Sequence, residues 1–557
     1  MKTHLRHFFS FSAILAGLVF AFHSPAYGNN GQQTSQEGPA QTASERTSSQ
    51  TYDARTGEKE ILTPLPGPAP RINGPKIYGV RPNKKFLYRI PCQGNRPINF
   101  EVTGLPAGLT LDKQNGIITG LSPAEKGEHA MRVTATNHSG EVSRDFKLVV
   151  GDKIALTPPT GWNSWGGHML KITDEIMRKV ADVFVEEGLA DVGFQYISID
   201  DCWMKMSPEA YFNRSPRKIR QHEGFDYEGL VGEVRDEDGA VIPNKHFPDM
   251  KALTDYIHSF GLKAGIYSAP GLTCQRFEGS QYNEARDADQ YAEWGFDLLK
   301  YDLCGGRSRL ERFQANGMDQ ADFWKPMVKN IRIQDRDIFF NLCQYGQEEP
   351  WTWGPELGVQ SWRIGWDLNH NVEEYFEAAL RIAVDLREYS KPGQWNDPDF
   401  MYIDKLSDYR KMAAPVKEIP LDTNERYQYV TLWSVIAAPF FFSANIDEID
   451  EFTIRLLSNA DVLNINQDAL GHVAKVVKNA DDQVIMVKDL ADGSKAVAVF
   501  NRDKADEATI RVDWELAGLC CDQNVYDVWR QKDLGVHKGG IDVQLSPNGV
   551  ALFKVGF

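Results

Sequence analysis

The sequence has few cysteines and lacks the patterns that bind a structural metal. Its 557 residues include seven cysteines, and they contain neither a Cys-x-x-Cys nor a His-x-x-x-His pair. These absences argue against a structural zinc site. The odd number leaves at least one cysteine unpaired within the chain and excludes a dense disulfide framework.

The chain also has fewer basic than acidic residues. Lysine and arginine number 61 against 77 aspartate and glutamate residues, which gives a formal net charge of −16. Nucleic acids and anionic membrane surfaces attract cationic proteins, so this balance predicts neither as a partner. It suits a neutral ligand.

Long apolar runs are absent except at the N-terminus, where one extends over residues 8–22. It follows Lys2 and Arg6 and precedes a small-residue site at Ala26-Tyr27-Gly28, the order of a cleaved signal peptide. The run is short for a bilayer span, and no second one follows. We therefore predict a signal peptide at residues 1–28 and an exported chain, periplasmic or extracellular, with no membrane span once mature. An uncleaved anchor is the alternative.

Composition predicts two further regions before residue 152. Residues 29–60 are rich in Gln, Ser, Thr and Gly, so they cannot bury enough apolar surface to offset their conformational entropy, and we predict a flexible linker. In residues 61–151, short alternating strands separated by Gly, Pro and Asn turns predict an all-β sandwich. Its segment TGLPAGLTLDKQNGIITG resembles the immunoglobulin-like (Ig-like) repeat that precedes many secreted bacterial enzymes. Such a module binds glycan or acts as a spacer, and we favour the spacer.

Residues 152–465 alternate buried strand patterns with amphipathic stretches. There are eight strand candidates, and most are followed by apolar residues that recur every three or four positions. Eight βα units predict a (β/α)8, or TIM, barrel. A doubly wound open sheet is the alternative, but no Gly-x-Gly-x-x-Gly turn follows a strand. Residues 466–557 return to strands with the spacing of an antiparallel β-sandwich, which we expect to pack against the barrel.

The ends of the predicted barrel strands carry the candidate site, because barrel sites lie at the C-terminal ends of the strands. Charged side chains there are Asp200, Asp201, Lys300, Asp302, Arg363, Asp367, Asp397 and Asp399. Aromatic side chains in the same segments are Trp162, Trp165, Trp203, Tyr267, Tyr345, Trp362 and Trp366. A sugar needs charged acceptors for its hydroxyl groups and a ring to stack on, so this set favours a carbohydrate ligand.

Other roles for these side chains stay open. The Asp200–Asp201 pair and Asp397-x-Asp399 could ligate Mg²⁺ or Ca²⁺ through oxygen, although we predict no metal and no cofactor. An aspartate at a strand end often caps the next helix, and core packing is the commoner role of a single ring. Six carboxylates on four strand ends are too many for capping alone.

Glycoside hydrolysis needs two carboxyl groups, one as acid and the other as nucleophile or base. Sequence spacing cannot select the pair, because strands bring distant residues together. Lys300, on the same strand end as Asp302, predicts a lowered pKa for that carboxyl, as suits a nucleophile. Trp366 gives Asp367 apolar sequence neighbours, which predict a raised pKa, as suits an acid.

From about Leu156 to its C-terminus the chain resembles glycoside hydrolase family 27, the retaining α-galactosidases. The matching segments, in the family's order, are LTPPTGWNSW, YISIDDCW, KAGIYSAPGLTC, LLKYDLC, WRIGWD, QWNDPDF and LSNADVLNINQDALG. The resemblance implies an exo-acting hydrolase that releases terminal α-D-galactose from oligo- or polysaccharides by double displacement. β-L-Arabinopyranosidase and α-N-acetylgalactosaminidase are alternatives within the family. A glycan-binding surface protein with an inactive barrel is the alternative outside it, and the presence of both carboxyl groups argues against this.

The resemblance also implies roles for individual residues. It makes Asp302 the nucleophile and Asp367 the acid/base, and it places Asp200 and Asp201 on the 4- and 6-hydroxyl groups of the sugar. The other substrate-binding positions are Trp162, Trp165, Tyr267, Lys300, Gln344, Tyr345, Arg363 and Asp399. A disulfide between Cys274 and Cys304 is implied as well.

Two departures from the family pattern concern the pocket. Where many members carry Cys-Glu-Trp after the fifth strand, this chain has Cys343-Gln344-Tyr345, so a charged contact becomes neutral and the ring changes. Trp366, directly before Asp367, is bulkier than usual, and we expect it to narrow the pocket. Both changes concern substrate detail and leave the two catalytic aspartates in place.

Overall fold

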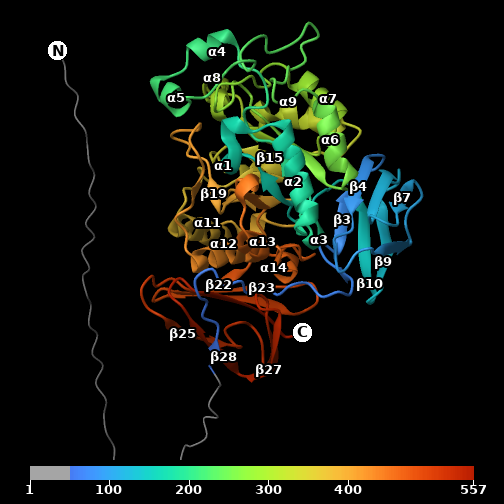
Figure 1. Ribbon diagram of the computed structural model, residues 1–557, viewed down its shortest axis with the longest axis vertical. Coiled ribbons are helices and arrows are strands. Elements are labelled where there is room, and N and C mark those ends of the chain that lie inside the picture. The colour runs from blue at the N-terminus through green and yellow to red at the C-terminus, as the bar shows by residue number, and fades with distance from the viewer. Residues whose placement is uncertain (1–50) are drawn as a thin grey trace, which may run out of the picture. The chain divides into compact units, whose positions relative to one another are not determined.

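The computed structural model describes residues 51–557 (Figure 1). The predicted signal peptide and the first part of the predicted linker, residues 29–50, lie outside the described residues. Within residues 51–557, no helix combines the length and apolar character needed to cross a membrane. Along the described chain, two β-rich regions flank a central α/β region.

The first β-rich region is a small sandwich. One sheet has the order β3 (Ile77–Val80), β10 (Gly140–Val150), β9 (Gly127–Asn137), β6 (Asn99–Thr103), and the other β4 (Lys85–Arg89), β8 (Ile117–Leu121), β7 (Leu109–Asp112). Side chains from both sheets form one buried core that includes Tyr88, Phe100, Val133, Phe146 and Leu148. The predicted all-β sandwich is confirmed, since alternating apolar residues bury one face of each sheet.

This sandwich contacts the central region through charged side chains. Arg89 is 8% exposed, and its Nη2 atom lies 3.1 Å from Asp191 Oδ1. The backbone N of Arg81 donates to Asp337 Oδ2 at 2.9 Å, and its guanidinium pairs with the same carboxylate. Separating a partly buried ion pair destabilises the protein, because each charge is then left without its partner. These contacts therefore join the sandwich to the central region, and residues 51–557 belong to one compact unit.

The central region contains one parallel sheet of nine strands. Their order is β17 (Trp395–Asp397), β16 (Ser361–Arg363), β15 (Phe339–Cys343), β14 (Leu298–Asp302), β13 (Lys263–Ser268), β12 (Tyr196–Ser198), β11 (Thr160–Asn163), β21 (Phe440–Ser443) and β18 (Met401–Tyr402). The two edge strands, β17 and β18, are separated in the chain only by residues 398–400. So short a segment spans at most about 14 Å, so the edges meet and the sheet closes. The predicted barrel is confirmed.

Helices surround this sheet (Figure 1). The longer ones are α2 (Asp174–Glu186), α6 (Met250–Ser259), α7 (Glu284–Trp294), α8 (Arg307–Ala315), α9 (Gln320–Ile333), α10 (Pro350–Leu357), α11 (Val372–Val384) and α12 (Thr423–Val435). In α2 the Thr173 hydroxyl accepts from the backbone N of Ile176 at 3.2 Å and caps the first turn. The buried positions of α2 recur every three or four residues: Met177, Val180, Ala181 and Phe184. This period turns one face of the helix toward the core.

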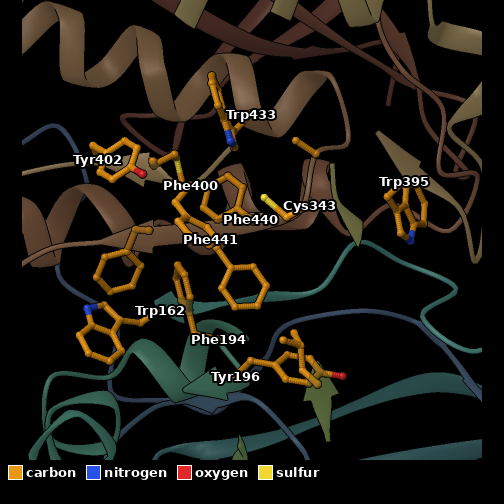
Figure 2. Close-up of a cluster of buried hydrophobic side chains, with 14 of the residues drawn as sticks. Trp162, Phe194, Tyr196, Cys343, Trp395, Phe400, Tyr402, Trp433, Phe440 and Phe441 are labelled. Atoms are coloured by element: carbon orange, nitrogen blue, oxygen red, sulfur yellow. The ribbon is translucent and has the colours of Figure 1, made fainter. Parts of the chain in front are cut away.

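Aromatic side chains fill much of the central core. Figure 2 shows Trp162, Phe194, Trp433, Phe440 and Phe441 in one buried cluster. Removing apolar surface from water stabilises the fold by roughly 25 cal/mol per Å². The strands that carry the candidate site are therefore anchored in a large apolar core.

The second β-rich region is an antiparallel sandwich, as predicted. Its larger sheet has the order β22 (Lys475–Ala480), β23 (Gln483–Asp489), β24 (Lys495–Asn501), β29 (Val550–Val555), β26 (Asp522–Asp527), β27 (Lys532–Lys538). Its smaller sheet has the order β1 (Tyr52–Asp53), β28 (Gly540–Leu545), β25 (Ala508–Asp513), with β1 parallel to β28. The Tyr52 hydroxyl also donates to Asp527 Oδ2 at 2.6 Å. The end of the segment predicted as linker thus adds an edge strand to this sandwich.

Candidate functional site

The charged strand ends lie side by side at one rim of the barrel. In the register of the sheet, Asp302 of β14 lies opposite Cys343 of β15, and Arg363 of β16 lies opposite Asp397 of β17. Parallel strands present their carboxyl ends at the same rim, which is where barrel sites form. The structure therefore brings these strand ends together at one rim, the place where the sequence predicted the site.

Asp302 ends strand β14 and is held by three hydrogen-bond donors. The Tyr345 hydroxyl donates to its Oδ1 at 2.7 Å, and the Tyr267 hydroxyl donates to its Oδ2 at 3.1 Å. The backbone N of Cys304 donates to Oδ1 at 3.1 Å. Because the side chain is only 4% exposed, these bonds fix the orientation of the carboxyl group.

The pKa of Asp302 is raised, and burial is the main cause. Lys300 and the hydrogen bond from Tyr345 lower this pKa, but they offset burial only in part. The position of Lys300 in the sequence predicted a lowered pKa for Asp302, and that prediction is wrong. The charge of a neighbour is visible in the sequence, whereas the desolvation of a closed barrel rim is not.

Lys300 and Asp200 form a buried ion pair. Lys300 Nζ lies 2.8 Å from Asp200 Oδ2, and Asn163 Nδ2 donates to the same oxygen at 3.0 Å. Burial is the largest single effect on the pKa of Lys300 and lowers it, but Asp200, Cys343 and Asp302 together outweigh burial, so the pKa is raised. Lys300 therefore keeps its proton and presents a fixed donor.

Asp201 is enclosed by backbone donors. Its Oδ1 accepts from the backbone N of Cys202 at 2.7 Å, and its Oδ2 accepts from the backbone N of Gln275 at 2.8 Å. Burial raises its pKa to about 7. Near neutral pH this carboxyl group therefore exists in both protonation states, so it can accept from or donate to a ligand hydroxyl.

Arg363 joins two carboxylates from different segments. Its Nη2 lies 3.0 Å from Asp399 Oδ2, and its Nη1 lies 3.2 Å from Asp367 Oδ1. The side chains of Arg363 and Asp399 are 2% and 1% exposed, whereas that of Asp367 is 66% exposed. The apolar surroundings that the sequence predicted for Asp367 are not present. The ring of Trp366 turns to Tyr345 instead, which leaves the carboxyl group facing solvent.

A cleft of about 750 Å³ opens at this rim. Asp367, Tyr345 and Trp165, the first residue of α1 (Trp165–His168), are among its lining residues. Asp302 lies directly behind the Tyr345 hydroxyl. Trp366 also lines the cleft and stacks on Tyr345, with ring centroids 4.8 Å apart and planes at 15°. The volume is that of a small-molecule site, and the rings offer apolar faces beside charged groups.

The predicted disulfide between Cys274 and Cys304 is present, and both cysteines line the cleft. Cys274 Sγ lies 3.8 Å from Asp302 Oδ2, so the three side chains are spaced as metal ligands would be. The sulfur atoms of the two cysteines are bonded to each other, however, and cysteines bind a metal as thiolates. This donor set does not fit a metal ion.

Of the ten predicted substrate-binding residues, Trp165 and Tyr345 line the cleft. The other eight are buried and do not line it: Trp162, Asp200, Asp201, Tyr267, Lys300, Gln344, Arg363 and Asp399. Trp162 is 0% exposed, its Nε1 donates to the Ala444 carbonyl at 3.0 Å, and it packs in the aromatic core (Figure 2). Gln344 is also 0% exposed and donates to the Gln347 carbonyl. The structure therefore brings Trp165 and Tyr345 to the site but leaves Trp162 and Gln344 behind its walls.

Sequence reasoning missed other residues of the site. Asn163, which orients Asp200, lies between Trp162 and Trp165 in TGWNSW, and its polar side chain at a strand end was an available signal. Gln275, whose backbone N donates to Asp201, belongs to the loop after β13. The cleft-lining residues between 213 and 221 belong to the loop after β12. Neither loop has a sequence pattern that predicts its position beside the strand ends.

Each of the three regions of the chain matches a known protein-family model. Residues 157–226 and 224–468 match the family model described as alpha galactosidase A. Residues 480–555 match the alpha galactosidase C-terminal beta sandwich domain, and residues 69–151 match an Ig domain.

Individual relatives cover most of the chain. An alpha-galactosidase of Cyamopsis tetragonoloba is 32% identical over 436 residues, which are 77% of this chain and 93% of the relative. Alpha-galactosidase 2 of Arabidopsis thaliana is 31% identical over 419 residues, covering 73% and 92%. The crystal structure of a candidate alpha-galactosidase/melibiase from Bacteroides fragilis has a TM-score of 0.75 at 32% identity, covering 87% of this chain and 97% of that chain.

Proposed function

The chain belongs to the α-galactosidase family, glycoside hydrolase family 27, and on that premise we propose that it releases terminal α-D-galactose from oligo- or polysaccharides with retained configuration. One observation of the site carries this proposal. A buried carboxylate, Asp302, is oriented by two tyrosine hydroxyls directly behind a cleft that a second carboxylate, Asp367, lines. Two carboxyl groups in such a place are what glycoside hydrolysis requires.

The reaction takes two steps. Asp302 Oδ attacks the anomeric carbon while Asp367 gives its proton to the leaving oxygen, so the glycosidic bond breaks and a galactosyl ester of Asp302 forms. Asp367 then takes a proton from water, and the resulting hydroxide releases galactose and restores the Asp302 carboxylate. The exposed position of Asp367 suits this exchange with solvent water.

The buried groups around Asp302 supply the hydroxyl contacts. We assign the 4- and 6-hydroxyl groups of galactose to Asp200 and Asp201, with Lys300 and Arg363 as further contacts. Ion pairs fix Asp200, Lys300 and Arg363 before the sugar arrives, and backbone donors fix Asp201, which lowers the entropy lost on binding. Tyr267 and Asp399 act by holding Asp302 and Arg363, and Trp165 offers a ring at the cleft.

Substrate choice within the family is the first test. We expect hydrolysis of 4-nitrophenyl α-D-galactoside to exceed that of the β-L-arabinopyranoside, because the latter lacks the C6 group that Asp201 would hold. The α-N-acetylgalactosaminide should also react more slowly. Values of kcat/KM for the three glycosides check this. A preference for either alternative glycoside would overturn the assignment of the sugar, and inactivity on all three would count against hydrolysis.

Replacing Tyr345 with phenylalanine should move the acidic limb of the pH profile to higher pH. The Tyr345 hydroxyl donates to Asp302 and favours the ionised carboxyl, so its loss raises the Asp302 pKa further. The ionised nucleophile, and with it activity, is then lost at a higher pH as the solution is acidified. The pH dependence of kcat/KM for the nitrophenyl galactoside measures the shift. An unchanged acidic limb in a folded Tyr345→Phe variant would contradict the role given to this bond.

A further inference from the structure

One wall of the cleft carries three basic side chains that form no ion pair with any residue of the described chain. Arg217 and Lys218 on the short helix α5 (Pro216–Gln221) and Arg276 in the loop after β13 line the cleft. Among the described residues of that lining, Asp367 is the sole carboxylate, and it already faces Arg363. This concentration of cations stands out in a chain with a net charge of −16.

None of the three cations forms an ion pair with a carboxylate in the described part of the chain, although burial lowers the pKa of Lys218 and the charge of Asp201 acts on it to offset this in part. Lys218 Nζ donates to the neutral Gln275 Oε1 at 2.7 Å, and Arg276 Nε reaches only the Ala210 carbonyl at 3.4 Å. Arg217 is exposed and makes no ion pair with any described residue. Arg235, on the same long loop after β12, shows the contrast, since it pairs with both Glu278 and Asp287. The cleft cations are therefore left available to a ligand.

The same cleft offers rings on which a further sugar could stack. Trp366 and Tyr409 line it and are 61% and 41% exposed. The guanidinium of Arg307, which begins α8 (Arg307–Ala315), lies 5.2 Å from the Trp366 ring centroid and adds a fourth cation beside the opening. Exposed rings next to unpaired guanidinium groups suit a saccharide that carries a negative group, because the ring takes its C–H face and the cation takes its charge.

We propose that this wall binds an anionic saccharide, with a carboxylate or sulfate ester on the sugar next to the galactose that is removed. This inference rests on the proposed function, since it extends the ligand outward from the galactose site. Arginine fits both anions because its planar donors match two oxygen atoms at once. The chain would then act on galactose attached to an acidic glycan, even though its overall charge is negative.

Competition against 4-nitrophenyl α-D-galactoside hydrolysis tests this. The inhibitors are α-D-galactosyl-(1→4)-D-galactose, its counterpart with galacturonate as the second sugar, and the neutral disaccharide sulfated at C6 of the second sugar. We expect the two acidic disaccharides to compete with inhibition constants about tenfold lower than the neutral one. Comparing the inhibition constants of the galacturonate-containing and the sulfated disaccharide identifies which anion is preferred. The preference should shrink as NaCl is raised, because salt screens the exposed cations.

Matched variants locate the effect. The double variant Arg217→Gln/Arg276→Gln should bring the acidic-to-neutral ratio close to one, whereas Arg220→Gln, on the same helix but outside the cleft lining, should retain it. Equal inhibition by acidic and neutral disaccharides in the native chain would overturn the proposal, as would a ratio that the double variant leaves intact. If the nitrophenyl galactoside is not hydrolysed, the proposed function fails. Calorimetric titration with the same three disaccharides would then still decide whether the wall prefers an anion.

Discussion

Replacing Asp302 with asparagine should reduce kcat/KM for an α-galactoside by on the order of 10⁴-fold or more, because the amide cannot attack the anomeric carbon. The exchange keeps the shape of the side chain. One of the two tyrosine hydroxyls, of Tyr267 or Tyr345, can still donate to the carbonyl oxygen, and the other can accept from the amide NH2 group. It also removes a buried charge that the site stabilises only in part. We therefore expect the melting temperature and the affinity for galactose to stay near those of the native chain.

Asp297 offers a matched control for this variant. It lies just before the other end of strand β14, where it is buried and pairs with His258 at 2.8 Å and Arg336 at 2.7 Å. Asp297→Asn should lower the free energy of unfolding by about 3 kcal/mol, because the charge of Arg336 loses its partner. Turnover per folded molecule should change little. Near-native turnover in Asp302→Asn, or an equal loss in the folded Asp297→Asn protein, would contradict the assignment.

Replacing Asp367 with alanine should have an effect that depends on the leaving group. A sugar leaves poorly without a proton, so kcat for a galactosyl disaccharide should fall by about 10²–10⁴-fold. Nitrophenolate leaves without protonation, so the first step with the nitrophenyl galactoside should be affected far less. Because the Asp367 side chain is 66% exposed, its removal should leave the fold intact.

Azide separates the two roles of Asp367. In the alanine variant, release of the galactosyl ester lacks a general base, and azide, which needs none, should restore turnover of the nitrophenyl galactoside and yield galactosyl azide. The native chain and Asp302→Asn should gain nothing from azide. If Asp367→Ala slows both substrates equally and azide has no effect, Asp367 is not the acid/base.

The architecture was largely predictable because its signals are local. Apolar periods of two and of three to four residues distinguish the flanking sandwiches from the barrel, and neither depends on contacts that are distant in sequence. The position of the site follows from topology alone, since parallel strands bring Asp302 and Arg363 to one rim. The disulfide was implied by family resemblance rather than by spacing.

What could not be predicted depends on burial and on partners distant in the chain. Trp162 and Trp165 belong to one short motif, yet the first lies on a strand in the core and the second begins a helix at the cleft. Likewise, Lys300 affects the charge of Asp302, but its ion pair is with Asp200, a hundred residues earlier. The unpaired cations at 217, 218 and 276 became apparent only once the loops after two different strands were placed on one cleft.

Trapping the covalent intermediate tests the central claim most directly. A 2-deoxy-2-fluoro-α-galactosyl donor with a good leaving group should form an ester with Asp302 and break down slowly, because fluorine disfavours the oxocarbenium-like transition state of both steps. Mass spectrometry should then show one fluorogalactosyl group on the peptide that contains Asp302, and none in Asp302→Asn. A label on another residue, or hydrolysis of the nitrophenyl galactoside to inverted galactose without any label, would contradict the account.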